Sequence, residues 1–372
     1  MDRRAFLATA AAAAATATTM KTAAGATVTP FGHTGAPITN ADPLPLGPLP
    51  GSRHPDTHIE FLKKPKILFG STDLPIFSGI GAVERIATGF RWAEGPVYFP
   101  AGRYLLFSDI PSNRIMRLSE DDNHLSVFRQ PSMNANGNTI DREGRLITCE
   151  HSGRRITRTE LDGSITIIAD KYNSKKLNSP NEVVVSSDGS IWFTDPAYGI
   201  SAYSGGSKAE PEQETRNVYR VDPKSGEVRI VADDFVQPNG IAFSPDEKKL
   251  YIVDSGFSDN PDNPCQIRVF DIDVGAGKLL NGKVFAEMPK PNVSDGVRCD
   301  TAGRVWCSVG WGDPSEDGVR CYMPDGDLIG KVHIPETVAN LCFGGQQRNR
   351  LYICGTTSIY ALDTNVQGAM KP

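Results

Sequence analysis

The sequence predicts an all-β protein, a six-bladed β-propeller with four-stranded blades. Glycine (36) and proline (27) are frequent among the 372 residues, and the apolar runs between them are short, which favours many short strands over long helices. From Val83 onward a strand–turn–strand pattern recurs six times. Its spacing of roughly 40 to 60 residues is typical of propeller blades. The preceding segment VERIATGF, residues 83–90, is expected to close the ring onto the short last blade.

Each repeat contains a turn formed by glycine or a substitute, and a carboxylate or amide residue about eight positions earlier. The turn residues are Gly102, Gly144, Gly189, Glu247, Gly303 and Gln347, and the polar residues are Glu94, Asn136, Asn181, Asn239, Asp295 and Asn340. The first strand of a propeller blade lines the central channel, so these six side chains are expected to meet at one end of it. Asn and Asp are also common as turn residues, but that role does not explain the Glu in the same register.

These six side chains predict a site for a divalent metal in the central channel. All of them offer oxygen, two are carboxylates, and neither His nor Cys occurs at these positions. Hard oxygen ligands favour calcium, magnesium or manganese over zinc. A wide channel suits a large, flexible coordination sphere, so Ca²⁺ is the first expectation, with Mg²⁺, Mn²⁺ and Zn²⁺ as alternatives.

The chain is expected to divide into three segments. Residues 1–26 combine Arg3-Arg4, Phe6-Leu7 and an alanine/threonine run, which is similar to a twin-arginine export signal; an ordinary Sec signal or a disordered tail is the alternative. Export would place the protein in the periplasm or outside the cell, with the twin-arginine machinery as a partner. Residues 27–75 are expected to be a linker or surface arm, and residues 76–372 the propeller.

Charge and composition exclude several classes of partner. The net charge is −5 and the basic residues are scattered, so no nucleic-acid partner is expected. No apolar run reaches the ~20 residues that a membrane helix needs. The seven cysteines show no CxxC pair and mostly lie in apolar strand runs, which indicates small buried side chains. The sequence does not indicate an oligomeric state.

Five motifs together resemble the SMP-30/gluconolactonase/LRE-like family, in particular its bacterial gluconolactonases. They are RWAEGPVYFP, NGNTIDREGRLITCEH, LNSPNEVVVSSDGSIWFTDPAYG, QPNGIAFSPDEKKLYIVDS and SDGVRCDTAGRVWCS, within residues 83–365. The resemblance implies a six-bladed propeller that is a metal-dependent lactonase. It also implies a metal held by Glu94, Asn239 and Asp295, with Asn181 as a further ligand or substrate contact. One departure is Glu182, where the family often has Asp.

The implied reaction is metal-dependent hydrolysis of a glucono-1,5-lactone-like aldonolactone to the aldonic acid, with water as nucleophile. Asp295 is expected to be ligand and general base, and Asp254 and His151 are further candidates for proton transfer. The predicted substrate-binding residues are Asn136, Asn138, Asn181, Arg154, Tyr198 and Asn340. An aryl esterase, a phosphotriesterase and a non-catalytic calcium-binding propeller remain alternatives, because related propellers differ mainly in their rim loops.

Overall fold

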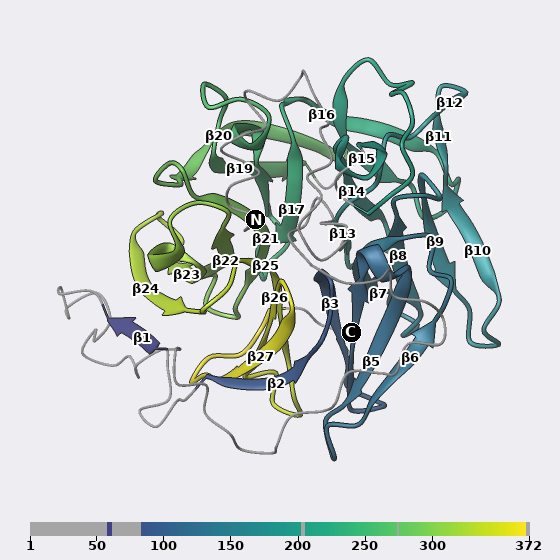
Figure 1. Ribbon diagram of the computed structural model, residues 1–372. Coiled ribbons are helices and arrows are strands. Elements are labelled where there is room, and N and C mark those ends of the chain that lie inside the picture. Colours follow the sequence, from purple (N-terminus) through teal and green to yellow (C-terminus); the bar gives the residue numbers. More distant parts are fainter. Residues whose placement is uncertain (1–57, 62–82, 202–204, 274, 370–372) are drawn as a thin grey trace, which may run out of the picture.

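The structure is a computed structural model that describes residues 58–61, 83–201, 205–273 and 275–369. Six antiparallel sheets surround a central axis (Figure 1), which confirms the predicted all-β, six-bladed propeller. The expected export signal and most of the 27–75 arm lie outside the described residues, so those expectations stay predictions.

Each blade runs from an inner strand to an outer strand in chain order. Blade 1 has β3 (Ala93–Phe99), β4 (Tyr104–Asp109), β5 (Arg114–Ser119) and β6 (Leu125–Arg129); blade 2 has β7 (Ala135–Ile140), β8 (Leu146–Glu150), β9 (Arg155–Thr159) and β10 (Ile165–Ala169). Blade 3 has β13 (Val183–Val185), β14 (Ile191–Asp195), β15 (Arg216–Val221) and β16 (Val228–Phe235); blade 4 has β17 (Pro238–Phe243), β18 (Lys249–Asp254), β19 (Gln266–Asp273) and β20 (Lys278–Glu287). Blade 5 has β21 (Val293–Cys299), β22 (Val305–Gly310), β23 (Gly318–Tyr322) and β24 (Leu328–His333); blade 6 has β25 (Val338–Gly344), β26 (Arg350–Gly355) and β27 (Ser358–Asp363).

The ring is closed by an early strand, as the sequence predicts. β2 (Glu84–Thr88) pairs antiparallel with β27 and is the outer strand of blade 6 (Figure 1). The pairing places Ala87 opposite Ile359 and leaves Ala87 fully buried. One blade is larger than predicted, because β1 (His58–Phe61) adds a fifth strand to blade 5 by pairing with β24.

The turn between the first two strands of each blade needs one residue in the left-handed region, where glycine is most easily accommodated. The predicted turn residues Gly144, Gly189, Glu247 and Gly303 have φ values of 78°, 85°, 55° and 79°. Two predictions were one position off. In blade 1 the left-handed residue is Arg103, directly after the predicted Gly102. In blade 6 the left-handed residues are Gly345 and Arg348, and Arg348 directly follows the predicted Gln347.

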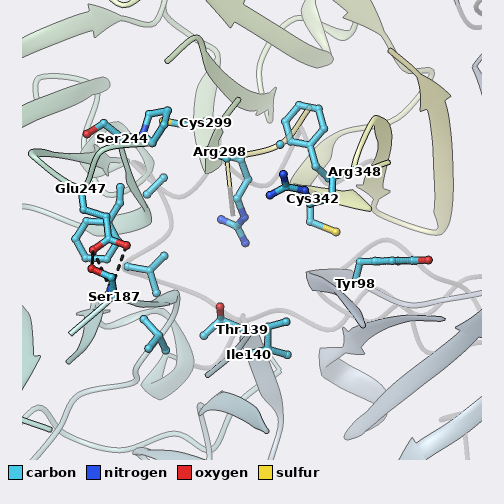
Figure 2. Close-up of a pocket in the computed structure, with 18 of the residues that line it drawn as sticks. Tyr98, Thr139, Ile140, Ser187, Ser244, Glu247, Arg298, Cys299, Cys342 and Arg348 are labelled. Atoms are coloured by element: carbon cyan, nitrogen blue, oxygen red, sulfur yellow. Dashed lines mark hydrogen bonds between the residues drawn. The ribbon is translucent and has the colours of Figure 1, made fainter. Parts of the chain in front are cut away.

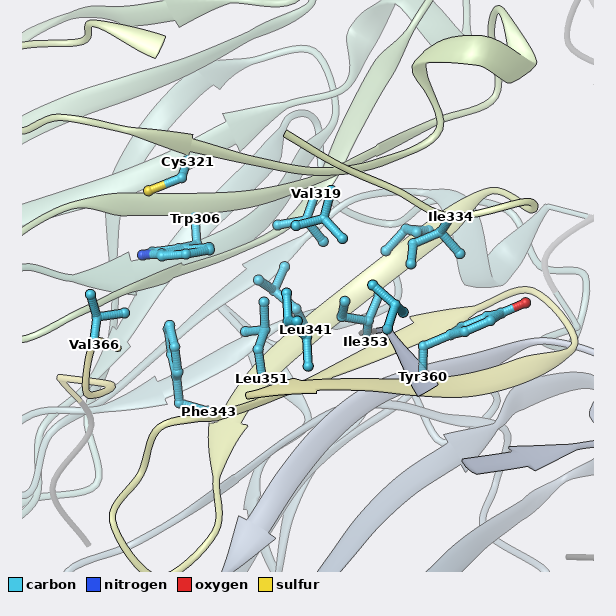
Figure 3. Close-up of a cluster of buried hydrophobic side chains, with 14 of the residues drawn as sticks. Trp306, Val319, Cys321, Ile334, Leu341, Phe343, Leu351, Ile353, Tyr360 and Val366 are labelled. Carbon is cyan, nitrogen blue, oxygen red and sulfur yellow. The ribbon is translucent and has the colours of Figure 1, made fainter. Parts of the chain in front are cut away.

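Apolar side chains fill the spaces between neighbouring blades. Figure 3 shows one such cluster between blades 5 and 6, where Trp306 and Val319 face Leu341 and Ile353. At roughly 25 cal/mol per Å² of apolar surface removed from water, such seams supply the main favourable free energy of folding. They hold the inner strands at fixed positions around the axis, which is what a precise site requires.

All seven cysteines are buried and none forms a disulfide, as predicted for small apolar-like side chains. Burial raises the pKa of their thiols, for example that of Cys307 to about 11. Among the helices of the described residues, none has the length and apolar character of a membrane span.

Candidate active site

The six polar side chains at the starts of the inner strands form what we call the axial ring. Every member is buried, with an exposed fraction of 7% or less. Two of them meet directly: Asn340 Nδ2 donates to Glu94 Oε2 at 3.0 Å. Burial raises the pKa of Glu94 well above its ordinary value, and the carboxylates of Asp295 and Glu182 raise it further. The members are Glu94, Asn136, Asn181, Asn239, Asp295 and Asn340.

Glycines that follow the ring residues explain how the inner strands approach so closely. A Cβ on Gly95 would lie 1.9 Å from the Asn136 carbonyl oxygen, and one on Gly240 would lie 2.2 Å from that of Asp295. No other residue fits there without displacing the neighbouring backbone. The EG, NG and DG pairs in the sequence therefore record the close packing of adjacent blades.

Hydroxyl groups tie two of the ring residues, Asn136 and Asn239, to the blade before them. Ser108 Oγ donates to the Asn136 carbonyl at 2.7 Å, and Thr194 Oγ1 donates to the Asn239 carbonyl at 2.7 Å. Both hydroxyls come from second strands, β4 and β14, and both are fully buried. The backbone of the ring is thus fixed across the blade boundaries.

Two ring amides are oriented by the residue that follows a second strand. Asn136 Nδ2 lies 3.1 Å from His151 Nε2, and Asn239 Nδ2 donates to Ser255 Oγ at 3.1 Å. Burial lowers the pKa of His151 to about 4, so the imidazole is neutral, accepts at Nε2 and carries its proton on Nδ1. Because each NH₂ group is engaged, the Oδ1 atoms of Asn136 and Asn239 are left without a hydrogen-bond partner in the described structure, although both are buried.

Buried oxygens without partners are costly, and their presence beside carboxylates fits a bound cation. Asn239 Oδ1, the Asn181 amide and the Glu94 and Asp295 carboxylates form an all-oxygen donor set. The part of the chain that the structure describes contains no group of three or more His, Cys, Asp or Glu side chains placed to hold a metal ion. The donor set predicted from the sequence needs no such group, because two of its four members, Asn181 and Asn239, are amides.

Asp254, which the sequence predicts as a catalytic residue, accepts hydrogen bonds from the backbone instead. Its carboxylate is 2% exposed and accepts from the main-chain N–H groups of Val236, Gln237 and Gly256 at 2.9–3.1 Å. Burial raises its pKa. Gln237 lies two residues before Asn239, so Asp254 holds the segment that presents a ring residue.

The same arrangement occurs in two other blades. Asp109 accepts from the N–H of Trp92 at 3.2 Å, two residues before Glu94. Asp195 accepts from the N–H groups of Asn178 and Ser179 at 2.8 Å, and Ser179 lies two residues before Asn181. These three aspartates end the second strands β4, β14 and β18. We call Asp109, Asp195 and Asp254 the anchoring aspartates.

Other predicted residues take different positions. Asn138 donates its Nδ2 hydrogens to the Gly95 carbonyl and Ser108 Oγ, both at 2.9 Å, and so links blades 1 and 2 rather than pointing an amide at the channel. Tyr198 begins η2 (Tyr198–Ile200), and its hydroxyl lies 2.7 Å from Ser258 Oγ and 3.3 Å from the Ser255 carbonyl. Burial raises the pKa of Tyr198, and the carboxylates of Asp259 and Asp295 raise it further.

Arg154 lies on the loop side of blade 2. Its Nε donates to the Leu177 carbonyl at 2.7 Å and its Nη1 to Glu212 at 3.2 Å, while the buried Nη2 has no partner among the described residues. It therefore connects the segment before Asn181 to the 205–216 insert.

Two residues below the ring, Glu182 and Arg298, were not predicted from the sequence to be part of the site. Glu182 comes from blade 3, and its Oε2 accepts from Asn340 Nδ2 of blade 6 at 2.5 Å and from Arg298 Nη2 of blade 5 at 3.3 Å. Blades 3 and 6 lie opposite each other, so this contact crosses the channel. The available signal was that Glu182 follows its ring residue, where glycine follows the ring residue in four other blades.

Beyond these residues the channel opens into a cavity of about 290 Å³. Its walls come from the far ends of the inner strands, including Tyr98, Thr139 and Cys342. Figure 2 shows Arg298 reaching into the middle of this cavity from β21. The channel thus has two mouths, with the axial ring at one end and the Arg298 cavity at the other.

The fold and the axial ring define a propeller with a buried, oxygen-rich site on its axis. Residues 92–358 match the profile of the SMP-30/Gluconolactonase/LRE-like region, and the chain belongs to this family. The gluconolactonase of Zymomonas mobilis subsp. mobilis is 28% identical over 308 residues, covering 77% of this chain and 82% of that protein.

Two further relatives are also lactonases. The structure of a Xanthomonas campestris gluconolactonase is 31% identical with a TM-score of 0.72, covering 87% of this chain and 99% of that one. A pentonolactonase of Haloferax volcanii is 29% identical over 276 residues, covering 72% of this chain and 82% of that protein.

Proposed function

We propose that this protein is a hydrolase that opens a sugar lactone, of the glucono-1,5-lactone type, in a reaction that depends on a divalent metal. The observation that carries the proposal is the buried amide oxygen of Asn239, which has no hydrogen-bond partner among the described residues and belongs to the same ring as the Glu94 and Asp295 carboxylates. Relatives that act on glucono- and pentonolactones support the substrate class.

Glu94, Asn181, Asn239 and Asp295 would hold the ion, and calcium suits this all-oxygen set best. When bound, the ion would act as a Lewis acid that polarises the lactone carbonyl and stabilises the developing oxyanion. Its charge would also offset the repulsion between Glu94 and Asp295, which adds to burial in raising the pKa of Glu94.

The protein's own groups then activate the water and bind the sugar. Asp295 takes the proton from the attacking water, because Asp254 is occupied by backbone N–H groups and His151 Nε2 by Asn136. The water oxygen bonds to the carbonyl carbon, and the bond from that carbon to the ring oxygen breaks. The leaving oxygen takes up the proton that Asp295 accepted, and the acid formed releases a proton to solvent to give the carboxylate product. Asn136 Oδ1 and the Nδ1–H of His151, both buried without partners among the described residues, are available to the sugar hydroxyls.

A substrate panel tests the proposal. Purified protein treated with chelator and then with Ca²⁺, Mg²⁺, Mn²⁺ or Zn²⁺ is assayed by pH-stat on aldonolactones, aryl esters and organophosphates. We expect lactone turnover that chelation removes and one of these ions restores. Turnover confined to aryl esters or organophosphates, or no turnover on any substrate, would overturn it.

Two variants connect the activity to the ring. Glu94→Gln and Asp295→Asn keep the side-chain shape and remove a charge, and each should lower kcat/KM by roughly 10²-fold or more. Arg320→Met is the control, because Arg320 is buried in blade 5 and pairs with Glu316, which ends the short 3-10 helix η4 (Pro314–Glu316). Near-normal turnover of either ring variant at saturating metal would show that the site is misplaced.

A further inference from the structure

Glu182 extends across the channel from a position at which most other blades have glycine. In blades 1, 2, 4 and 5 the ring residue is followed by glycine, and in blade 3 it is followed by Glu182. This carboxylate is 1% exposed and lies beneath the axial ring. Taken from water without a counter-charge, it would be strongly destabilising.

Arg298 supplies that counter-charge from another blade. Its Nη1 and Nη2 lie 3.4 and 3.3 Å from Glu182 Oε2, and its Nη1 also donates to the Val297 carbonyl at 2.8 Å. The side chain is 10% exposed and approaches from the cavity side of the channel (Figure 2). The ion pair therefore sits between the cavity and the ring.

The pair connects to the ring through Asn340. The Nδ2 group of Asn340 is shared between Glu182 Oε2 at 2.5 Å and the two oxygens of Glu94 at 3.0 and 3.2 Å. Asn340 Oδ1 accepts from the Leu341 N–H at 2.8 Å, which fixes the amide's orientation. Arg298, Glu182, Asn340 and Glu94 thus form one continuous network.

We propose that Glu182 and Arg298 are positioning residues that set the charge of the cation site, with Arg298 as a permanent counter-cation that keeps Glu182 from becoming a metal ligand. The inference rests on the proposed function, because it presumes a cation at the axial ring. With Arg298 in place, the carboxylate charge available to the ion is that of Glu94 and Asp295. Without it, a third carboxylate would attract the ion.

The charge argument predicts opposite signs for the two single variants. Glu182→Gln leaves the Arg298 charge uncompensated and should weaken Ca²⁺ binding by roughly tenfold or more. Arg298→Met leaves the Glu182 charge uncompensated and should tighten it by about tenfold. The double variant removes a neutral pair and should return to within about threefold of the wild-type Kd.

The measurement is calorimetric titration of CaCl₂ into the chelator-treated full chain, with folding checked by circular dichroism. Arg298→Lys keeps the charge and should bind as wild type does, and Arg320→Met should leave the Kd unchanged. If Arg298→Met does not fold, the comparison of Glu182→Gln with the double variant still tests the idea, since the second change should restore affinity.

Weaker Ca²⁺ binding in both single variants, or a double variant that binds Ca²⁺ as weakly as Glu182→Gln does, would show that the pair is merely structural. In that case wild-type calcium binding and lactone turnover would persist, and only this inference would fail. If wild-type protein binds no divalent cation and Glu94→Gln changes nothing, the proposed function and this inference fall together.

Discussion

Asn239 donates its amide hydrogen to Ser255 Oγ at 3.1 Å, and Ser255 donates its own hydrogen to the Ser294 carbonyl at 2.7 Å. Because the hydroxyl hydrogen is committed, Ser255 can only accept from Asn239, and the amide of Asn239 cannot flip. Its oxygen must therefore face the ring.

This relationship predicts the effect of Ser255→Ala. The amide of Asn239 loses its constraint, so Ca²⁺ affinity should fall by roughly three- to tenfold, with about 1 kcal/mol lost from the free energy of unfolding. Calorimetric titration and urea denaturation measure the two effects. Ser190→Ala is the control, since Ser190 is equally buried but serves Trp192 and Asp188 at a turn. Unchanged Ca²⁺ affinity in Ser255→Ala would contradict the orienting role.

Asp254→Asn separates anchoring from proton transfer. Asn keeps one acceptor oxygen and adds an NH₂ group facing backbone N–H donors, so about 1–3 kcal/mol of stability should be lost. Turnover should fall, while the pH dependence of kcat/KM keeps its wild-type shape. Asp195→Asn, which changes the anchoring aspartate of blade 3, should behave similarly, since Asp195 also accepts from two backbone N–H groups. Loss of an ionisation from the pH profile in Asp254→Asn alone would identify Asp254 as a catalytic base instead.

His151 predicts a pH dependence of stability. Burial lowers its pKa to about 4, whereas the unfolded chain has an ordinary value near 6.5. Between these values the unfolded state binds the extra proton, so the His151 contribution to stability is complete above about pH 6.5 and is lost as the pH falls toward 4. The loss is on the order of 2–3 kcal/mol.

His151→Gln tests this directly, because Gln can still accept from Asn136 but does not titrate. Urea denaturation at several pH values should show a shallower decline for the variant between pH 6.5 and 4. Parallel curves for wild type and variant would mean that the pKa of His151 is the same in the folded and unfolded protein.

Ring closure makes β2 sensitive at its buried positions, Ile86 and Ala87. Ala87 is fully buried against blade 6, whereas its neighbour Arg85 is exposed. Ala87→Asp places a carboxylate in the apolar seam and should cost about 3–5 kcal/mol. Arg85→Asp changes the same strand on its solvent side and should cost less than about 1 kcal/mol. Thermal unfolding compares the two, and equal losses would argue against the closure.

The fold could be predicted from the sequence because the same pattern of polar residue, turn and apolar strand occurs in all six repeats. The polar position, the turn and the following apolar strand locate five inner strands to within a few residues, and only the turns near Gly102 and Gln347 are displaced by one. β13 is the exception, beginning after Asn181 at Val183. β1 escaped prediction because a single short strand has no periodicity that a sequence can reveal.

The site was predictable in its members but not in their use. Sequence spacing brings Glu94, Asn239 and Asp295 to one end of the channel. It cannot say which hydrogen bonds each group makes, because these partners come from other blades. Asp254 was expected to take part in catalysis, and its three backbone donors became evident only with the loop geometry. The Glu182–Arg298 pair joins residues 116 positions apart, which no local pattern encodes.

The closure of the ring also bears on how the chain is made. The hydroxyls of Ser358 and Thr88 are hydrogen-bonded although they lie 270 positions apart. During translation β2 leaves the ribosome long before its partner, so the nascent polypeptide carries an unpaired strand edge for nearly the whole of its synthesis. The last blade can form only when the final strands emerge, and this late, long-range step is where assistance from chaperones would count most.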